Sequence, residues 1–295
     1  MKPSWATRLV DRWLARSARP DAGALAAVAG LAPATVVTGA SRGIGLALAE
    51  RFSEAGNAVV LIARSAGKLE VAADTLRNRM PGATILTLSL DVTAAGAGDA
   101  IDRFLAGHGC YLDVLVNNAA IGLGGPFEDG AASSIDDLVA LNIGALTRLM
   151  RHALPAMTAR GRGGILNVSS LGGAVPGPYQ AAYYASKAYV QSLTEAVAAE
   201  CAGSGVRIAV VAPGPVETGF HASMNANDAL YRRLLPAMAP RQVARAAVSG
   251  FMLGRHVIYP GIIAPVAAVA VRVLPHAITV PLVARLLDNR GQPKK

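Results

Sequence analysis

Cysteine and charged residues are both scarce in this chain of 295 residues. The two cysteines, Cys110 and Cys201, are too few for a disulfide framework or a cysteine-rich metal site, and they fit a reducing compartment. Charged residues make up 16% of the chain, against roughly 25% in an ordinary soluble domain, while hydrophobic residues make up 53%. This balance excludes an intrinsically disordered chain, and the length suffices for a sizeable core. We expect no metal site.

Acidic residues are few at both ends of the chain. Residues 1–33 hold five basic and two acidic residues, and residues 232–295 hold ten basic residues with Asp288 as their single acid. The part between them is mildly acidic. A nucleic-acid enzyme more often gathers its basic residues around its site, so we expect no nucleic-acid partner. Basic, apolar ends favour contacts with a membrane surface or with another subunit.

No late run of uncharged residues is long enough to span a bilayer. The longest, Val257–Val271, contains two prolines and falls short of the roughly 18 apolar residues of a spanning helix. Near the start, Trp5, Leu9 and Trp13 recur every four residues beside arginines, which predicts a short amphipathic helix. Both ends could lie on a membrane or pack against the domain or a second subunit. We expect a cytoplasmic protein, with the inner face of a membrane as a peripheral location.

Short apolar runs alternate with longer helical patterns along most of the chain. Runs rich in Val, Ile and Leu suit strands buried on both faces. Strands that alternate with helices predict a doubly wound parallel sheet with right-handed crossovers, the α/β class. The predicted strands are Thr35–Thr38, Ala58–Ala63, Thr84–Leu88, Val114–Val116, Ile165–Val168 and Ile208–Val211, and the predicted helices are Ile44–Ala55, Lys68–Met80, Ala97–Ala106, Ile135–Thr158 and Ala181–Ala202.

A glycine-rich motif, TGASRGIG, follows the first predicted strand. Gly39 permits a tight turn, Gly43 lets the backbone approach a pyrophosphate, and Gly45 lets the next helix pack close to the strand. The helix N-terminus supplies free N–H groups and a positive dipole for a phosphate. Such a turn can also be merely tight, but its place between a buried strand and a helix favours phosphate binding.

The pair Tyr183 and Lys187 lies on a predicted helix. Residues four apart share a helical face, so Lys187 sits beside Tyr183, while Tyr184 points about 100° away. A nearby ammonium lowers a tyrosine's pKa from its usual value near 10 and makes it usable as an acid or base. A surface lysine beside a core aromatic is the alternative interpretation of this pattern.

A serine pair closes the fifth predicted strand. At the carboxyl end of a strand, Ser170 points into the crevice where open α/β sheets bind ligands, and its hydroxyl could hold a substrate oxygen. The alternative is a serine that only caps the following turn.

Taken together, these motifs resemble those of the short-chain dehydrogenases/reductases in their single-domain form. The resemblance spans roughly residues 34–220 and rests on order and spacing: TGASRGIG at 38–45, NNAA at 117–120, Asn142, Ser170, the YxxxK of Tyr183 and Lys187, and Pro213-Gly214. It implies a Rossmann-like fold. Residues 34–259 would form the domain, with extensions at 1–33 and 260–295.

The resemblance also implies a role for each motif residue. Tyr183 would exchange a proton with the substrate oxygen, Lys187 would assist it and bind the nicotinamide ribose, and Ser170 would hydrogen-bond the reacting group. Asn142 would hold a water that relays protons to Lys187. Ala120 departs from the pattern, because the family usually has glycine there. The implied cofactor-binding residues are Gly39, Ser41, Arg42, Gly43, Ile44, Gly45, Arg64, Asp91, Val92, Asn117, Ala119, Tyr183, Lys187, Pro213, Gly214, Val216 and Thr218.

The end of the second predicted strand bears on the choice of nicotinamide cofactor. An acidic residue there would bind the ribose 2′-hydroxyl of NAD(H) and repel the 2′-phosphate of NADP(H). The chain instead has Ala63 and Arg64, and Arg42 lies in the glycine motif. Guanidinium groups suit a phosphate, although either arginine could be a solvated charge. The pattern favours NADP(H), with NAD(H) as the alternative.

The substrate is harder to identify than the cofactor. Residues 219–239 are rich in large apolar side chains, and by resemblance they cover the substrate. Such side chains would suit an apolar carbonyl or alcohol, including a lipid-like one. They could equally form a helix packed on the core. The resemblance implies a homodimer or homotetramer. The alternative to an enzyme is a catalytically silent protein of the same fold that acts as a cofactor sensor or a membrane-surface interaction module.

Overall fold

The computed structural model describes residues 20–220 and 236–288. The predicted amphipathic helix around Trp5 and most of the apolar segment 219–239 lie outside these residues.

A parallel sheet of seven strands forms the centre of the described chain. Its order is β3-β2-β1-β4-β5-β6-β7, and every neighbouring pair is parallel. The fold is the predicted α/β, Rossmann-like one. The two-residue β7 was not predicted. The strands are β1 (Ala32–Thr38), β2 (Ala58–Ala63), β3 (Ile85–Ser89), β4 (Cys110–Asn117), β5 (Gly163–Val168), β6 (Val206–Val211) and β7 (Val257–Ile258).

Helices cover both faces of the sheet, because neighbouring residues of each strand point to opposite sides. On β1, Val37 packs into the core beneath one layer of helices and Val36 into the core beneath the other. The first layer is α3 (Gly43–Glu54), α4 (Ala66–Arg79) and α11 (Pro240–Met252), and the second is α5 (Ala97–Gly107), α7 (Leu146–Arg160) and α8 (Ala181–Glu200).

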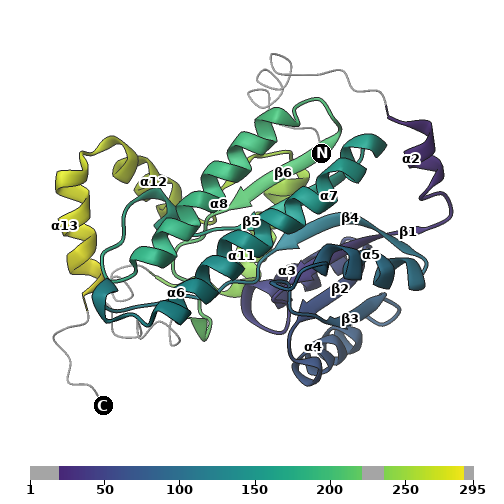
Figure 1. Cartoon of the computed structure of the whole chain (residues 1–295), viewed down its shortest axis with the longest axis horizontal. Coiled ribbons are helices and arrows are strands. Elements are labelled where there is room, and N and C mark those ends of the chain that lie inside the picture. Colours follow the sequence, from purple (N-terminus) through teal and green to yellow (C-terminus); the bar gives the residue numbers. More distant parts are fainter. Residues whose placement is uncertain (1–19, 221–235, 289–295) are drawn as a thin grey trace.

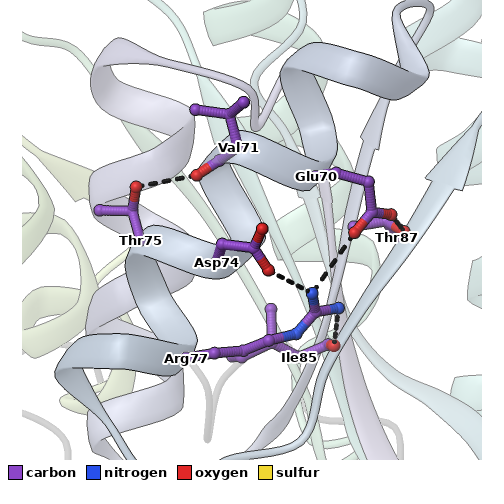
Figure 2. A network of polar contacts seen from close by, with 7 residues as sticks. All are labelled: Glu70, Val71, Asp74, Thr75, Arg77, Ile85 and Thr87. Atoms are coloured by element: carbon purple, nitrogen blue, oxygen red, sulfur yellow. Dashed lines mark hydrogen bonds and ion pairs between the residues drawn. The ribbon is translucent and has the colours of Figure 1, made fainter.

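The edge strand β3 is held by a polar network from α4 (Figure 2). Arg77 reaches from α4 to the carbonyl of Ile85 at 3.0 Å and also pairs with Asp74 and Glu70. Thr87 donates to the Glu70 carboxylate. Charged groups along an edge strand discourage pairing with a foreign strand.

The predicted helix Ile135–Thr158 is interrupted where Asn142 lies. It consists of α6 (Ala132–Val139), a π-helical segment over Ala140–Ala145, and α7. π-helical turns inside α-helices are frequent at functional sites.

The segments beyond the sheet lie at opposite ends of the long axis (Figure 1). The short helix α2 (Ala22–Ala26) lies at one end, where Asp21 N–H donates to the carbonyl of Ala159. At the other end lie α12 (Ile263–Val273) and α13 (His276–Leu287). No helix within residues 20–220 and 236–288 is long and apolar enough to cross a membrane.

Candidate active site

A cavity of about 1070 Å³ opens at the carboxyl ends of the strands. The chain leaves β1 toward one side of the sheet and β4 toward the other, so a crevice forms between their ends, where such folds bind ligands. Pockets for small molecules are typically about 300–1000 Å³, so this cavity has room for a large ligand and a second, smaller one. Its wall includes residues that follow β1, β2, β4, β5 and β6, together with side chains of α12 and α13.

Two glycines of the TGASRGIG motif adopt backbone angles that other residues avoid. Gly39 has φ of 65° and Gly43 has φ of 61°. A Cβ on Gly39 would lie 2.9 Å from Ala119 Cα, and one on Gly45 would lie 2.4 Å from the carbonyl oxygen of Gly39. The turn therefore needs glycine at these positions.

Asn118 fixes this turn against the end of β4. Its Nδ2 donates to the carbonyls of Thr38 at 2.9 Å and Gly39 at 3.2 Å. Thr38 Oγ1 in turn accepts from the N–H groups of Asn118 and Ala119, both at 3.0 Å. These bonds join the ends of β1 and β4 and set the width of the crevice.

The N-terminus of α3 faces the cavity and suits a pyrophosphate. Arg42 is its N-cap residue, and its side chain makes no capping hydrogen bond. The first N–H groups of a helix lack partners within the helix and attract anions. Gly43 and Ile44 line the cavity there. The residues present thus fit the phosphates of a dinucleotide.

Three cationic side chains, Arg42, Arg64 and Lys68, line one end of the cavity. Among the described residues, none of the three forms a salt bridge, whereas Arg79 and Arg241 at the same wall both pair with Glu50. Asp91 is the nearby acid. Its carboxylate accepts from the hydroxyl and N–H of Thr93, and these bonds lower its pKa. The end of β2 therefore presents positive charge without an acid of its own.

Ser170, Tyr183 and Lys187 line the same cavity beyond the glycine turn. Ser170 follows β5, and Tyr183 and Lys187 lie one turn apart on α8. The Lys187 ammonium lies 5.7 Å from the centroid of the Tyr183 ring. Phe220 packs on that ring, with centroids 5.5 Å apart. Three of the four side chains predicted as catalytic thus line the same cavity, and the fourth, Asn142, does not.

Lys187 is 4% exposed. Its Nζ donates to the carbonyl of Val168 at 3.0 Å. Burial lowers its pKa to about 8, because the charged form loses its hydration. A lysine with this pKa changes protonation close to neutral pH and suits proton transfer.

Asn142 does not line the cavity, and its side chain is fully engaged in the structure. The amide donates to the carbonyl of Ile121 and to Ser186 Oγ, and it accepts from the N–H of Ile121. Ile121 itself lines the cavity, and Ser186 precedes Lys187. Asn142 therefore joins the loop after β4 to α8 beside the predicted catalytic residues.

One sequence expectation needs correction. Asn117, a predicted cofactor residue, does not line the cavity, because its side chain turns into the sheet and donates to Asn167 Oδ1 at 2.9 Å. Tyr184, on a different helical face from Tyr183, also lines the cavity. Gly172 and Gly177 pack closely against its ring.

The remaining predicted residues divide between the cavity wall and its support. Gly45 lies behind the turn, where it brings α3 close to β1. Ala120, where the family usually has glycine, lines the cavity as well. The predicted cofactor residues that line it are Gly39, Ser41, Arg42, Gly43, Ile44, Arg64, Asp91, Val92, Ala119, Pro213, Gly214, Val216 and Thr218.

Sequence reasoning missed several residues that shape the site. Thr38 and Asn118 lie inside the quoted motifs, which could have pointed to them. Ser169 Oγ donates to the carbonyl of Lys187 at 2.8 Å, and Gln191 Nε2 donates to the carbonyl of Ser170 at 2.7 Å. Nothing in the sequence links Gln191 to Ser170, because the contact depends on how α8 packs beside β5.

A family model described as short chain dehydrogenase matches residues 33–229 of the sequence. The chain belongs to this family. Galactitol 2-dehydrogenase from Rhizobium johnstonii is 40% identical over 196 residues, which are 65% of this chain and 75% of that protein. As a short-chain dehydrogenase, the protein is an oxidoreductase. The elements α11, β7, α12 and α13 lie beyond the residues that the family model matches.

Solved short-chain dehydrogenase structures share the fold. One from Sphingobium yanoikuyae, in complex with NADPH, is 31% identical with a TM-score of 0.71, covering 81% of this chain and 92% of that one. A 3-ketoacyl-(acyl-carrier-protein) reductase from Brucella melitensis, complexed with NADH, is 27% identical with a TM-score of 0.69, covering 77% and 94%. The similar structures thus include both kinds of nicotinamide cofactor.

Proposed function

We propose that this protein is an NADP(H)-dependent oxidoreductase that interconverts a carbonyl and an alcohol on an apolar substrate. The observation that carries the proposal is that Ser170, Tyr183 and Lys187 line one cavity with the glycine turn after β1. A bound dinucleotide would supply hydride transfer. The N-terminus of α3 would hold its pyrophosphate.

The protein's own residues would handle charge and protons at the substrate oxygen. During reduction that oxygen gains negative charge, and the hydroxyls of Ser170 and Tyr183 would stabilise it by hydrogen bonds. Tyr183 would then donate its proton. The positive charge of Lys187, 5.7 Å from the ring, stabilises the phenolate that remains. Oxidation of an alcohol uses the same groups in reverse.

Asn142 would act here as a positioning residue. Its side chain holds the loop at Ile121 and the hydroxyl of Ser186 at fixed distances from each other. The water relay toward Lys187 that the family resemblance implies stays a prediction.

The preference for NADP(H) is supported by charge at the end of β2. Arg42, Arg64 and Lys68 line the cavity where the glycine turn and β2 meet. An arginine suits a phosphate because its fork of N–H donors matches two oxygens. The Arg42 guanidinium also lies near Gly219. It therefore lies between the cationic end of the cavity and the segment that follows β6.

An apolar substrate is supported by the other end of the cavity. Its wall beyond Tyr183 is formed mainly by carbon-rich side chains, which favour a substrate without charge. These are Leu171, Val175, Tyr184, Phe220, Ala267, Val271, Val283, Leu286 and Leu287. The homodimer or homotetramer expected from the sequence stays a prediction, which analytical ultracentrifugation would check.

The experiment that tests this function follows the loss of NADPH absorbance with a panel of carbonyl compounds of increasing apolar size. We expect turnover to rise with apolar size and to be slower with NADH. Absence of turnover with every carbonyl and with every alcohol in the reverse direction would contradict the proposal.

A further inference from the structure

The helices α12 and α13 carry two different faces. On the inner face, Ala264 and Ala268 are buried, and Val283 and Leu287 are buried on α13. The contact is tied by Arg272, which donates to Gln191 Oε1 at 3.2 Å and lies 3.7 Å from Glu195 Oε1 on α8. The inner face therefore packs on the domain, one of the arrangements that the sequence left open.

The outer face is apolar and exposed. Along Ile262 and α12, the side chains of Ile262, Val266, Val269 and Val273 are 85%, 70%, 63% and 77% exposed. Their spacing of four, three and four residues places them on one helical face. On α13, Ile278 and Leu282 are both 56% exposed. We call these six residues the outer face. Exposed apolar surface of this kind marks a contact with another molecule or with a membrane.

Charge decides between the candidates for that contact. Arg285 is exposed on α13 and follows Leu282 by three residues, so it lies beside the outer face. A second copy of the chain would bring the same positive charge to this face and would be repelled. Anionic lipid would instead be attracted, by roughly 1 kcal/mol for each basic residue close to the surface. The outer face is also purely aliphatic, whereas protein interfaces are enriched in Tyr, Trp, Met and Arg.

We propose that the outer face docks on an anionic lipid bilayer and that the substrate enters the cavity from that bilayer. The second half of this proposal rests on the proposed function. Ala267 and Val271 of α12 and Leu286 of α13 line the cavity, so one layer of helix separates it from the outer face. Figure 1 shows the pair at the end of the molecule, beside α8 and away from α2. A compound dissolved in lipid would thus reach the apolar end of the cavity without crossing water.

The docking is tested by sedimenting the full-length protein with vesicles of phosphatidylglycerol and phosphatidylcholine in about equal parts, at low salt. We expect the wild-type protein in the pellet, and less of it with phosphatidylcholine alone. Val266→Glu and Val273→Glu should each lower the vesicle-bound fraction about tenfold, because each places a carboxylate in the apolar layer.

Val71→Glu is the matched control. Val71 lies on α4 and is 70% exposed, as Val266 is, and the substitution changes the charge equally. This variant should pellet as the wild-type protein does. The proposal is overturned if the wild-type protein stays in the supernatant or if Val266→Glu pellets equally well. The proposal also fails if the wild-type protein is a dimer in lipid-free buffer, Val266→Glu converts that dimer to monomers, and neither protein binds vesicles.

Substrate entry is tested by NADPH oxidation with a long-chain ketone held in the vesicles and with a short, water-soluble ketone. Val266→Glu should slow the first reaction about tenfold, in line with the lost binding, and leave the second unchanged. Equal rates for wild type and variant on the vesicle-held ketone would overturn entry from the bilayer. A wild-type protein that pellets but reduces neither ketone would contradict the proposed function and leave docking supported.

Discussion

At the scale of single residues, Tyr183 and Tyr184 are neighbours whose surroundings differ. Both line the cavity, but the lysine one turn further along α8 lies beside Tyr183 only. We expect Tyr183→Phe to lower kcat by about 100-fold or more, since the ring keeps its packing and loses its proton. Cofactor affinity, measured by fluorescence titration, should stay unchanged.

Tyr184→Phe is the control for that substitution. Its ring packs on Gly172 and Gly177 and can keep this packing without the hydroxyl. We expect a change in KM at most, because Tyr184 contributes to the wall of the cavity. Equal losses of kcat in the two variants would show that the proton donor has been assigned wrongly.

Burial of Lys187 costs stability in a pH-dependent way. Its pKa falls from the ordinary 10.5 to about 8, which at about 1.4 kcal/mol per pH unit corresponds to about 3 kcal/mol. The folded state binds fewer protons than the unfolded state between these values, so stability rises with pH from about 8 to 10.5 and the full cost applies below 8. Lys187→Met removes this cost but also removes the hydrogen bond to the carbonyl of Val168, which contributes roughly 1 kcal/mol. The substitution should therefore raise the unfolding free energy at pH 7 by about 2 kcal/mol.

Urea unfolding at several pH values would measure this difference. We expect the gain from Lys187→Met to shrink as the pH rises from 8 to 10.5, and catalysis to be lost. Lys68→Met, at an exposed lysine, should show no such pH-dependent gain. A Lys187→Met variant less stable than the wild-type protein at pH 7 would show that burial of this ammonium is not a net cost.

At the scale of elements, the end of β2 is expected to set cofactor preference. Ala63→Asp with Arg64→Ser would place an acid where the ribose 2′-hydroxyl lies and remove one phosphate contact. A charge-assisted contact contributes roughly 1.5–3 kcal/mol, so the ratio of kcat/KM for NADPH over NADH should fall about tenfold or more. Arg103→Ser on α5, outside the cavity wall, should leave the ratio unchanged. A wild-type enzyme that favours NADH would contradict this interpretation of β2.

Gln191 links α8 to the loop after β5 and to α12. Its amide donates to the carbonyl of Ser170 and accepts from Arg272. Gln191→Glu keeps an acceptor for Arg272 but loses the donor to Ser170, so we expect kcat to fall severalfold with cofactor KM unchanged. Arg272→Leu should loosen α12 and leave kcat on a water-soluble ketone near the wild-type value. Equal kcat in Gln191→Glu and wild type would exclude a positioning role.

The sequence predicted elements best where apolar runs are short and bounded by turns. Ala58–Ala63 is β2 as predicted, while the predicted Val114–Val116 covers only part of the C-terminal half of β4. β4 begins earlier because Cys110 and Leu112 add apolar pairing next to β1. The strand β7 was missed because two residues carry no periodicity, and only the edge of β6 makes them a strand.

The site was predictable where a backbone motif dictates its geometry. The glycine turn and the Tyr183–Lys187 spacing depend on local geometry, so the residues alone indicate them. The sequence does not show which of two neighbouring asparagines faces the glycine turn: Asn118 bonds to Thr38 and Gly39, whereas Asn117 bonds to Asn167 in the sheet. The contributions of α12 and α13 depend on packing between segments far apart in the sequence, which no local pattern encodes.

At the scale of the whole molecule, the cavity wall draws on residues from Gly39 to Leu287, so a ligand there requires most of the fold. NADPH at about 100 times its Kd should raise the unfolding free energy by about 2.7 kcal/mol. Since 1 kcal/mol shifts Tm by roughly 2–4 °C in a domain of this size, scanning calorimetry should show a rise of roughly 5–10 °C. NADH at the same concentration should give a smaller rise, because it lacks the phosphate that Arg42 and Arg64 are expected to hold. In the Arg64→Ser variant the two rises should approach each other. Equal rises in the wild-type protein would show that the cationic end of the cavity does not hold the 2′-phosphate.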